Sequence, residues 1–435
     1  MKILILAISL SLITFFSHAQ IITTIAGNGP GNSGNGNLAT LCELYYPVDI
    51  TNDNLGNTYI SDNGNHQIRK IDKFGVITLF ASIGLPSAII CDKNNNIYVA
   101  SQGEMSVVKF SPTGIRTTIA GKCDGVGAYS GDGGLATLAG LNYPHGVAID
   151  SLNNVYIATT GDGRIRKVDT MGIINTICGN GTNSHTGDGG PANIATLGVP
   201  RGICLDKLGN LYIAEQGSCC IRKINTLGII STVGGLGNGS SNYTGDGGLA
   251  TFAELCPLDV IVDSIGNIYL SDAGNQVIRK IDLNGIITTV AGNGSKLGPG
   301  GSAGNGSFSG DGGLPTLASL NAPWGLFIDK QGSLLIADWF NHRIRKVNKS
   351  TVSVGELYVA TKFSIYPNPT NGIFNISGLA SNTQIVIYDA IGQIVFSSDS
   401  DGTNESINLV ALADGIYLVK VKFYEKEFNA KIIKN

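Results

Sequence analysis

The sequence predicts an all-β protein: a six-bladed β-propeller closed by its amino-terminal strand, followed by a small β-sandwich at the carboxyl end. Three observations support this prediction. One unit recurs six times along the chain, and the final strand missing from the sixth copy is found near the start of the chain. Sixty glycines, thirteen prolines and only 14% charged residues are typical of a turn-rich β protein rather than a helical one.

The amino terminus has the pattern of a secretory signal peptide. Lys2 precedes an apolar run from Ile3 to Phe16, and Ser17 and Ala19 are the small residues that a signal peptidase reads. We therefore expect residues 1–19 to be a signal peptide. The alternative, a membrane anchor, is less favoured because a spanning helix needs about 20 apolar residues. No later segment of the sequence has the length and hydrophobicity to span a bilayer.

The repeat is defined by a fixed spacing. A proline is followed twelve residues later by a large side chain and eleven residues after that by a lysine, in six copies without a gap. The prolines and lysines are Pro47/Lys70, Pro86/Lys109, Pro144/Lys167, Pro200/Lys223, Pro257/Lys280 and Pro323/Lys346. An aspartate opens a turn six residues before each large residue, at Asp53, Asp92, Asp150, Asp206, Asp263 and Asp329.

Each copy contains four strand-like runs separated by turn residues. In the third copy these runs are 147–149, 155–158, 165–168 and 173–177. They are almost continuously apolar, as expected of sheets that are buried on both faces. Four short antiparallel strands per unit, with the sheets packed around an axis, describe a propeller, which leaves few exposed strand edges.

The fourth strand supports closure of the propeller. It reads GIRTTIAG from Gly114, GIINTICG from Gly172, GIISTVGG from Gly228 and GIITTVAG from Gly285, with a weaker version from Gly75. No such strand follows Lys346, but Ile21 to Gly27 reads IITTIAG. Because the first and last blades of a ring are neighbours, we expect this amino-terminal strand to complete the sixth blade.

The units resemble NHL repeats, since the pattern PxGVAxDxxGNxYIADxxNHRIRK is nearly complete in copies three, five and six. The resemblance covers residues 20–348 and implies a six-bladed β-propeller. It implies little about activity, because propellers of this kind bind RNA, bind proteins, act as sensors or catalyse reactions.

Two sets of charged residues recur together. Carboxylates and arginines are present in the same four copies, as Asp62/Arg69, Glu215/Arg222, Asp272/Arg279 and Asp338/Arg345, whereas copy two has lost both partners. This joint presence predicts structural carboxylate–arginine pairs. In copy three Arg166 lacks the matching carboxylate, and Asp162 is the nearest substitute.

The long connections between copies carry Gly-Asp-Gly-Gly motifs at Asp132, Asp188, Asp246 and Asp311. These carboxylates could face cations, but we favour tight turns, because the motif is too short for a calcium loop and no lysine or helix follows, as a phosphate loop requires. His66 and His342 share a repeat position, and a zinc site would need a third ligand. We predict no metal and no cofactor.

The positions at which the copies differ are better candidates for a ligand site. The two residues after each proline open the innermost strand at the mouth of the channel. There Asp49, His145, Arg201, Asp259 and Trp324 form a mixed polar and aromatic set of the kind that a ligand pocket needs. The alternative is that they are solvated residues with no partner.

Other classes of function have less support. The net charge of −3 and the even spread of lysines, one per copy, give no reason to expect nucleic acid. No catalytic motif of the GxSxG type is present.

Export makes the eight cysteines candidates for disulfides; Cys42, Cys123 and Cys256 lie in or beside connections and are the better placed, but their pairing stays open.

Residues 349–362 are predicted to be a linker, and residues 363–435 a separate small β-sandwich of about seven strands. FSIYPNPTNGIFNISG from Phe363, IYDAIGQIVF from Ile387, LADGIYLVKV from Leu412 and the terminal KIIKN resemble the type A sorting domain of the type IX secretion system of Bacteroidota. The resemblance implies that the secretion machinery recognises residues 363–435 and that the domain is then removed.

Together these features predict a monomeric protein that is secreted or attached to the outer cell surface, where the propeller binds a protein or glycan ligand. The alternative is a secreted propeller enzyme, lactonase-like or lyase-like, with its site at the channel mouth. Because propeller enzymes assemble their sites from single residues on several blades, the sequence leaves the question of catalysis open.

Overall fold

In the computed structural model the described residues are 20–294, 307–349 and 364–435, apart from 378, 380–382, 401–403 and 424–425. They belong to two compact units, Met1–Thr351 and Val352–Asn435. The predicted signal peptide lies outside the described residues, as does nearly all of the predicted linker. In the described part of the chain, no helix is long and apolar enough to cross a membrane.

The described part of the first unit contains six four-stranded antiparallel sheets, numbered here 1 to 6 along the chain. The first strands of the sheets are β2 (Pro47–Asn52), β6 (Pro86–Cys91), β10 (Pro144–Ile149), β14 (Pro200–Leu205), β18 (Pro257–Val262) and β22 (Pro323–Ile328). The second strands are β3 (Thr58–Asp62), β7 (Ile97–Ser101), β11 (Val155–Thr159), β15 (Leu211–Glu215), β19 (Ile268–Asp272) and β23 (Leu334–Asp338).

The third strands are β4 (Gln67–Ile71), β8 (Ser106–Phe110), β12 (Arg164–Val168), β16 (Cys220–Ile224), β20 (Val277–Ile281) and β24 (Arg343–Val347). The fourth strands are β5 (Ile77–Ser82), β9 (Arg116–Ala120), β13 (Ile174–Cys178), β17 (Ile230–Gly234) and β21 (Ile287–Ala291) in sheets 1 to 5, and β1 (Ile22–Ala26) in sheet 6. The fourth strand of sheet 6 therefore comes from the start of the chain.

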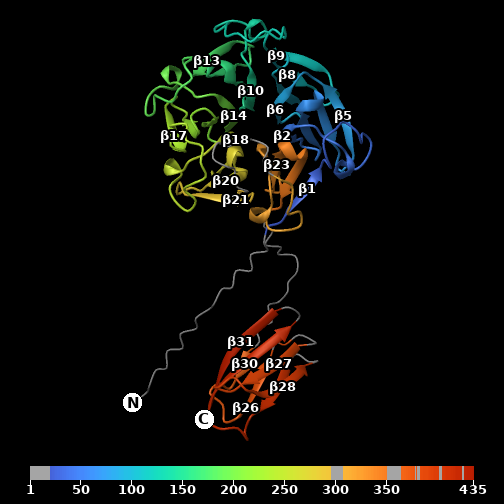
Figure 1. Cartoon of the computed structure of the whole chain (residues 1–435), viewed down its shortest axis with the longest axis vertical. Coiled ribbons are helices and arrows are strands. Elements are labelled where there is room, and N and C mark those ends of the chain that lie inside the picture. The colour runs from blue at the N-terminus through green and yellow to red at the C-terminus, as the bar shows by residue number, and fades with distance from the viewer. Residues whose placement is uncertain are drawn as a thin grey trace. The chain divides into compact units, whose positions relative to one another are not determined.

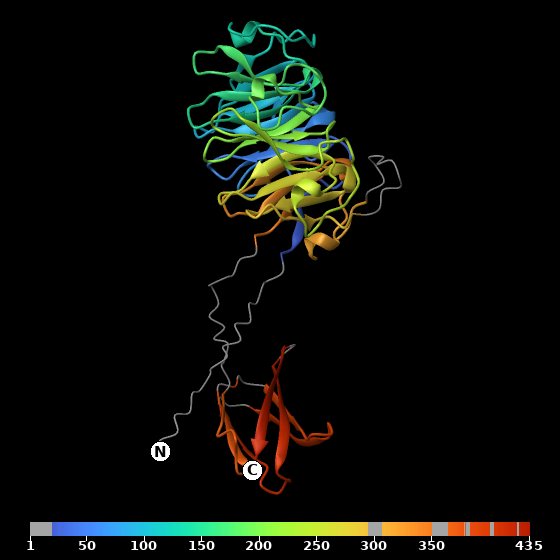
Figure 2. The ribbon, with the colours of Figure 1, turned by 90° about the vertical axis from the view of Figure 1, so that its left-hand side faces the viewer.

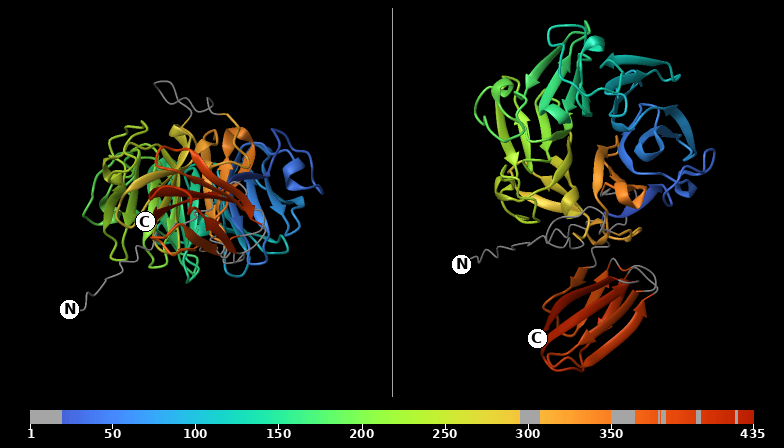
Figure 3. Two further views of the ribbon diagram at one scale, coloured as in Figure 1. Left: turned by 90° about the horizontal axis from the view of Figure 1, so that it is seen from below. Right: turned by 45° about the horizontal axis from the view of Figure 1, so that its top comes forward.

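The sheets follow one another around a common centre (Figure 3). The first strand of each sheet contacts the first strand of the next, and β22 of sheet 6 contacts β2 of sheet 1. In sheet 6, β1 runs antiparallel to β24, with Ile22 opposite Val347 and Thr24 opposite Arg345. The strand that the sixth copy lacks is thus supplied by the segment IITTIAG.

Short 3-10 helices occupy two kinds of connection. Those before the first strand of a sheet are η1 (Ala39–Leu41), η3 (Ala136–Leu138), η5 (Ala192–Ile194), η6 (Ala250–Phe252) and η8 (Pro315–Leu317). Those between the second and third strands are η2 (Asn63–Asn65), η4 (Thr160–Asp162), η7 (Ala273–Asn275) and η9 (Trp339–Asn341).

The recurrent aspartate shapes the turn between the first and second strands. In sheet 1, Asp53 Oδ1 accepts hydrogen bonds from the backbone N–H groups of Leu55 and Asn57 at 2.9 and 2.8 Å. Its Oδ2 accepts one from the Tyr59 hydroxyl at 3.2 Å. An aspartate that bonds its own following backbone favours a turn over a continued strand. This contact explains the constant spacing of six residues between the aspartate and the large side chain.

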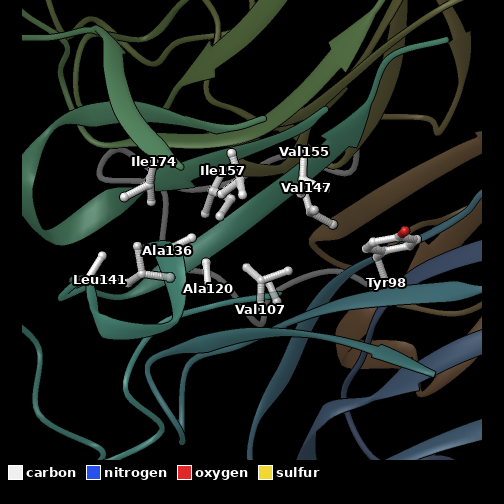
Figure 4. Packing of buried hydrophobic residues seen from close by; sticks show 12 residues of the cluster. Tyr98, Val107, Ala120, Ala136, Leu141, Val147, Val155, Ile157 and Ile174 are labelled. Atoms are coloured by element: carbon white, nitrogen blue, oxygen red, sulfur yellow. The ribbon is translucent and has the colours of Figure 1, made fainter. Parts of the chain in front are cut away.

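Apolar side chains of neighbouring sheets interdigitate to form the core. Figure 4 shows one such cluster, in which Tyr98 and Val107 of sheet 2 lie near Val147, Val155 and Ile157 of sheet 3. Equivalent clusters join sheets 3 and 4, sheets 4 and 5, sheets 5 and 6, sheets 6 and 1, and sheets 1 and 2. Both faces of each sheet are therefore buried, as the unbroken apolar runs predict.

The second unit contains two antiparallel sheets in its described residues (Figure 2). One has the order β25 (Ser364–Tyr366), β26 (Ile373–Ser377), β29 (Asn404–Asn408), and the other β28 (Ile394–Ser400), β27 (Thr383–Tyr388), β30 (Gly415–Phe423), β31 (Lys426–Lys434). A single apolar cluster contains Phe374 and Ile407 of the first sheet and Ile387 and Val419 of the second. The two sheets therefore pack face to face.

The role of β1 leads to a testable prediction. Ile22 is fully buried between sheets 5 and 6, whereas the neighbouring Ile21 is 38% exposed. Ile22→Ala should lower the free energy of unfolding by about 2–5 kcal/mol because it leaves a cavity. Deletion of residues 21–27 should lower the free energy of unfolding further. Thermal unfolding of the purified protein measures both, with Ile21→Ala as a control that should change little. A deletion variant that melts like the parent would contradict this role.

Candidate functional site

Three of the five predicted mouth residues come together in the structure. The rings of His145 in sheet 3 and Trp324 in sheet 6 are stacked, with centroids 5.3 Å apart and an interplanar angle of 8°. The Arg201 guanidinium of sheet 4 lies 5.4 Å from the centre of the Trp324 ring. Sheets 3 and 6 are three steps apart in either direction around the series, so the stack bridges opposite sides of the central opening.

Buried nitrogen atoms without hydrogen-bond partners mark the same region. His145 is only 3% exposed, and its Nδ1 atom has no partner within the described part of the chain; the same holds for Nε1 of Trp324 and of Trp339. A buried donor without a partner costs about 1–3 kcal/mol. Burial, and secondarily the charge of Arg201, lowers the pKa of His145 well below its usual value. The imidazole ring is therefore held in its neutral form.

A set of aromatic side chains continues from Trp324 towards sheet 1. We define the aromatic patch as Tyr45, Tyr46, Trp324, Trp339 and Phe340. Trp339 lies 4.7 Å from Trp324, 4.1 Å from Phe340 and 5.4 Å from Tyr46, measured between ring centroids. Tyr45 and Tyr46 are 4.4 Å apart. All five side chains are partly exposed, so the patch is a surface rather than a part of the core.

Sequence reasoning found only Trp324 of this patch. A signal for Phe340 was nonetheless present in the repeat. The other five copies have glycine at that position, at Gly64, Gly103, Gly161, Gly217 and Gly274. Trp339 and Phe340 are placed by η9, and Tyr45 and Tyr46 directly precede β2. The patch therefore lies at the boundary where sheet 6 meets sheet 1.

The remaining two mouth residues, Asp49 and Asp259, make contacts between neighbouring sheets. Asp49 in sheet 1 accepts a hydrogen bond from the N–H of Ile89 in sheet 2 at 2.8 Å. Asp259 in sheet 5 accepts one from the N–H of Leu326 in sheet 6 at 2.9 Å. Both carboxylates also fit beside glycines, since a Cβ atom at Gly325 would overlap Asp49 and one at Gly202 would overlap Asp259.

Both aspartates also line a cavity of about 230 Å³ whose walls are formed by the first strands of all six sheets. Most of the lining is aliphatic, including Ile89, Ile203 and Leu326. Burial raises the pKa of Asp259 to about 7. Burial and the charge of Asp259 raise the pKa of Asp49 well above its usual value. The pair therefore carries less negative charge at neutral pH than two exposed carboxylates would.

The predicted carboxylate–arginine pairs are found as short contacts. The nitrogen–oxygen distances are 3.4 Å for Asp62–Arg69, 3.1 Å for Glu215–Arg222, 3.5 Å for Asp272–Arg279 and 3.3 Å for Asp338–Arg345, and all eight side chains are 0% exposed. Burial raises the pKa of Asp62, Asp272 and Asp338 to about 6, against the opposing effect of hydrogen bonds and of the arginines.

The aspartates of the Gly-Asp-Gly-Gly motifs supply a second set of partners that sequence reasoning missed. The distances are 2.5 Å for Arg166–Asp132, 2.6 Å for Arg222–Asp188, 2.6 Å for Arg279–Asp246 and 2.8 Å for Arg345–Asp311. Arg166 thus pairs with Asp132 rather than with Asp162, whose carboxylate accepts a hydrogen bond from Thr159 at 2.5 Å. These aspartates fix the connections to the sheets.

His66 and His342 each accept a backbone hydrogen bond instead of converging on one another. His66 Nδ1 accepts the N–H of Leu85 at 3.1 Å, and His342 Nδ1 accepts the N–H of Tyr46 at 3.1 Å. Across residues 20–294, 307–349 and the described part of 364–435, no group of three or more His, Cys, Asp or Glu side chains is placed to hold a metal ion.

Comparison with known families agrees with both parts of the sequence interpretation. Residues 117–184 and 178–242 match the teneurin NHL domain, and residues 364–435 match the secretion system C-terminal sorting domain. The chain is an NHL-repeat protein with a type IX sorting domain. It is therefore a protein that is secreted or attached to the outer cell surface.

Relatives of this NHL-repeat protein are much longer. Protein SUPPRESSOR OF QUENCHING 1, chloroplastic, of Arabidopsis thaliana is 28% identical over 75% of this chain and 30% of its own length. Teneurin-m of Drosophila melanogaster is 27% identical over 70% of this chain and 11% of its own. The chain thus spans less than a third of either relative.

Solved structures similar to this protein share its propeller architecture. A protein of unknown function from Bacteroides thetaiotaomicron has a TM-score of 0.58 at 19% identity, covering 76% of each chain. An auxiliary nutrient binding protein from Bacteroides ovatus has a TM-score of 0.55 at 16% identity, again covering 76% of each chain. At these identities the likeness shows the fold alone.

The buried pairs generate a second prediction. Arg279→Ala would leave Asp246 and Asp272 without their cation, and breaking a buried pair from one side costs about 3–5 kcal/mol. Arg116→Ala is the matched control, because its pair with Glu104 is partly exposed and such pairs contribute about 0–1 kcal/mol. Chemical denaturation of both variants measures the difference. Equal stability of the two variants would contradict a structural role for Arg279.

Proposed function

We propose that the propeller is an exported glycan-binding module and that the aromatic patch is its binding surface. The single observation that supports this proposal is the contact network of five partly exposed aromatic side chains, Tyr45, Tyr46, Trp324, Trp339 and Phe340, at the mouth of the propeller. Elsewhere on the described surface, exposed apolar side chains are mostly aliphatic residues at the tips of turns.

The chemistry of the patch suits carbohydrate. A sugar ring presents C–H groups on one face and hydroxyl groups at its edges. Aromatic faces provide a large apolar area for the C–H face, and tyrosine and tryptophan add a polar group at the ring edge. Rigid aromatic side chains also lose little conformational entropy on binding, which favours affinity. The patch offers both an apolar face and polar edges.

Polar groups beside the patch would provide specificity. Arg201 lies over Trp324, and its Nε donates to Gln216 Oε1 at 2.5 Å, so the guanidinium is held in a defined orientation. The His145 ring stacks on the same Trp324 ring. A few fixed polar groups around an apolar surface are typical of small-molecule and glycan sites. Asp49 and Asp259 already accept hydrogen bonds from backbone N–H groups, so they contribute less directly to specificity.

A second candidate function is a secreted enzyme, and the aspartate-lined cavity favours it. Two carboxyl groups whose pKa values are raised by burial, as for Asp49 and Asp259, are a feature of acid–base sites. Against this candidate, each carboxylate already accepts hydrogen bonds from the backbone. Formation of a product from a bound glycan would favour the enzyme, and unchanged recovery of the glycan would favour the binding module.

We further propose the domain boundaries given by the sequence: signal peptide 1–19, closed six-bladed propeller 20–348, linker 349–362 and sorting domain 363–435. The pairing of β1 with β24 and the contact of β22 with β2 support closure of the ring. Pairing with β1 covers the edge of β24, which would otherwise be the outer edge of sheet 6.

The export proposal predicts a shortened product. Protein recovered from the medium or the cell surface of the producing bacterium should lack residues 1–19 and the sorting domain 363–435, and intact-mass analysis measures this directly. A variant that ends at residue 362 provides the control and should remain inside the cell, because the secretion machinery would have no signal to recognise. An exported product that retains the whole of residues 363–435 would contradict removal of the domain.

The glycan proposal predicts that patch variants lose binding while the fold is kept. The full-length protein should bind a subset of glycans on an array, with the affinity measured by calorimetry. Trp339→Ala and Tyr45→Ala should each weaken binding at least about tenfold, the loss expected for an aromatic side chain at the centre of a site. The matched control is Phe252→Ala, which removes an aromatic ring that is 71% exposed on η6, outside the patch.

Circular dichroism and thermal unfolding of the three variants separate loss of binding from loss of fold. Tyr45 is 37% exposed, so its truncation should leave the melting temperature close to that of the parent. A parent protein that binds no glycan, or patch variants that bind as tightly as Phe252→Ala, would overturn the proposal.

A further inference from the structure

One repeat position connects most of the sheets to the next sheet through its side chain. It follows the turn between the second and third strands and has a left-handed backbone, with φ between 51° and 61°. Its residues are His66, Met105, Gly163, Cys219, Gln276 and His342 in sheets 1 to 6. We call this residue the latch residue, because its side chain extends to the neighbouring sheet.

In four of the six sheets the latch residue accepts the backbone N–H of the residue that precedes the proline of the next sheet. The pairs are His66 with Leu85 at 3.1 Å, Met105 with Tyr143 at 3.4 Å, Gln276 with Ala322, and His342 with Tyr46 at 3.1 Å. These pairs fix where the latch side chain points. In sheet 3 the latch residue is Gly163, which has no side chain.

Between sheets 4 and 5 the latch consists of two cysteines. Cys219 is the latch residue of sheet 4, and Cys256 directly precedes Pro257 of sheet 5. The segment before Pro257 is one residue shorter than in sheets 1, 3, 4 and 6, and the N–H of Cys256 donates to Asp272 in its own sheet at 2.7 Å. The Cys256 side chain therefore takes the place of the N–H, and the two thiols are hydrogen-bonded to each other.

The surroundings of this thiol pair are closely packed on one side and open to solvent on the other. Cys219 is 5% exposed and Cys256 is partly exposed, so the pair can be reached from solvent on one side. A Cβ atom at Gly274 would lie 2.7 Å from the Cys256 sulfur, so glycine is needed there. The neighbouring Cys220 lies against Gly235 on another side of the strand and does not compete. All eight cysteines, Cys219 and Cys256 included, are free thiols in the structure.

The electrostatics assist reaction at Cys256. The hydrogen bond from Cys219, and to a lesser degree the positive charge of Arg201, lowers the pKa of the Cys256 thiol. The same hydrogen bond and burial raise the pKa of Cys219. Cys256 is also the more exposed of the two thiols, so an incoming disulfide reaches Cys256 first and the buried Cys219 resolves the intermediate.

We propose that Cys219 and Cys256 form a disulfide that joins sheets 4 and 5 in the exported protein. The Cys256 thiolate attacks a small-molecule disulfide or the disulfide of an oxidoreductase and releases one thiolate. Cys219 then loses its proton and displaces the second thiolate. One sulfur–sulfur bond forms, the two cysteines lose two protons and two electrons, and the attacked disulfide is reduced to two thiols. Export places the protein in a compartment where such bonds persist.

This cross-link would replace a hydrogen-bonded latch with a covalent one and would close a loop from residue 219 to residue 256. A disulfide that closes a loop of this length restricts the unfolded chain and so favours the folded state. It would hold sheets 4 and 5 together independently of whether the propeller binds a glycan, so it can be tested separately from the proposed function.

Mass spectrometry of the exported protein tests the proposal. The protein is taken from the medium, alkylated without reductant, digested and analysed. A peptide linking Cys219 to Cys256 is expected, and reduction should lower the melting temperature of the full chain by several degrees. Cys219→Ser and Cys256→Ser should lose the linked peptide and the effect of reductant. Cys123→Ser, which removes an exposed cysteine, should keep both.

Two outcomes would overturn the proposal. In one, Cys219 and Cys256 are both fully alkylated in the exported protein and remain so after incubation with oxidised glutathione. In the other, the linked peptides join different cysteines. If the serine variants fold poorly, alkylation of the unaltered parent still decides between these outcomes, because it requires no substitution.

Discussion

The buried arginine on the third strand of every sheet except sheet 2 holds the rest of the structure in place. In sheet 6, Arg345 is 0% exposed and contacts Asp338 at 3.3 Å and Asp311 at 2.8 Å. Asp338 in turn accepts hydrogen bonds from the N–H of Asn321 at 2.7 Å and from the side chain of Asn341 at 2.9 Å. A buried guanidinium is tolerated only when its charge is matched. One cation thus fixes the connection into the sheet and the turn that carries Trp339 and Phe340.

The repeated scaffold explains where specific features arise. Because the arginine network sets the backbone of the turn in five of the six sheets, a side chain there can change without altering the path of the chain. Phe340 occurs where five copies have glycine, and Cys219 occurs where other copies have histidine, methionine, glycine or glutamine. Both changes lie on the turn between the second and third strands. The same turn therefore supplies the aromatic patch in sheet 6 and the thiol pair between sheets 4 and 5.

Much of the fold could be predicted from the sequence because its signals are local. The constant spacing from Asp53 to Tyr59 reflects an aspartate bonding its own turn, and IITTIAG matches the other fourth strands directly. The candidate site was harder to predict from the sequence. Asp132 and Arg166 are far apart in sequence, so their contact depends on how the connection folds back over the sheet. The stack of His145 on Trp324 requires knowing that sheets 3 and 6 face each other. Trp339 and Phe340 could not be assigned to a site from the sequence, because their contact with Tyr46 depends on sheet 6 lying beside sheet 1.

Arg201, one of the mouth residues, also influences the thiol pair. Its guanidinium lies over Trp324, and its charge also lowers the pKa of the Cys256 thiol. A guanidinium beside a thiolate is partly neutralised, whereas beside a disulfide it keeps its full charge for a ligand. The charge of Arg201 therefore acts on both the channel mouth and the thiol pair. The symmetry of the propeller brings single residues from different sheets to one end, and a few departures from the repeat then suffice to build a site there.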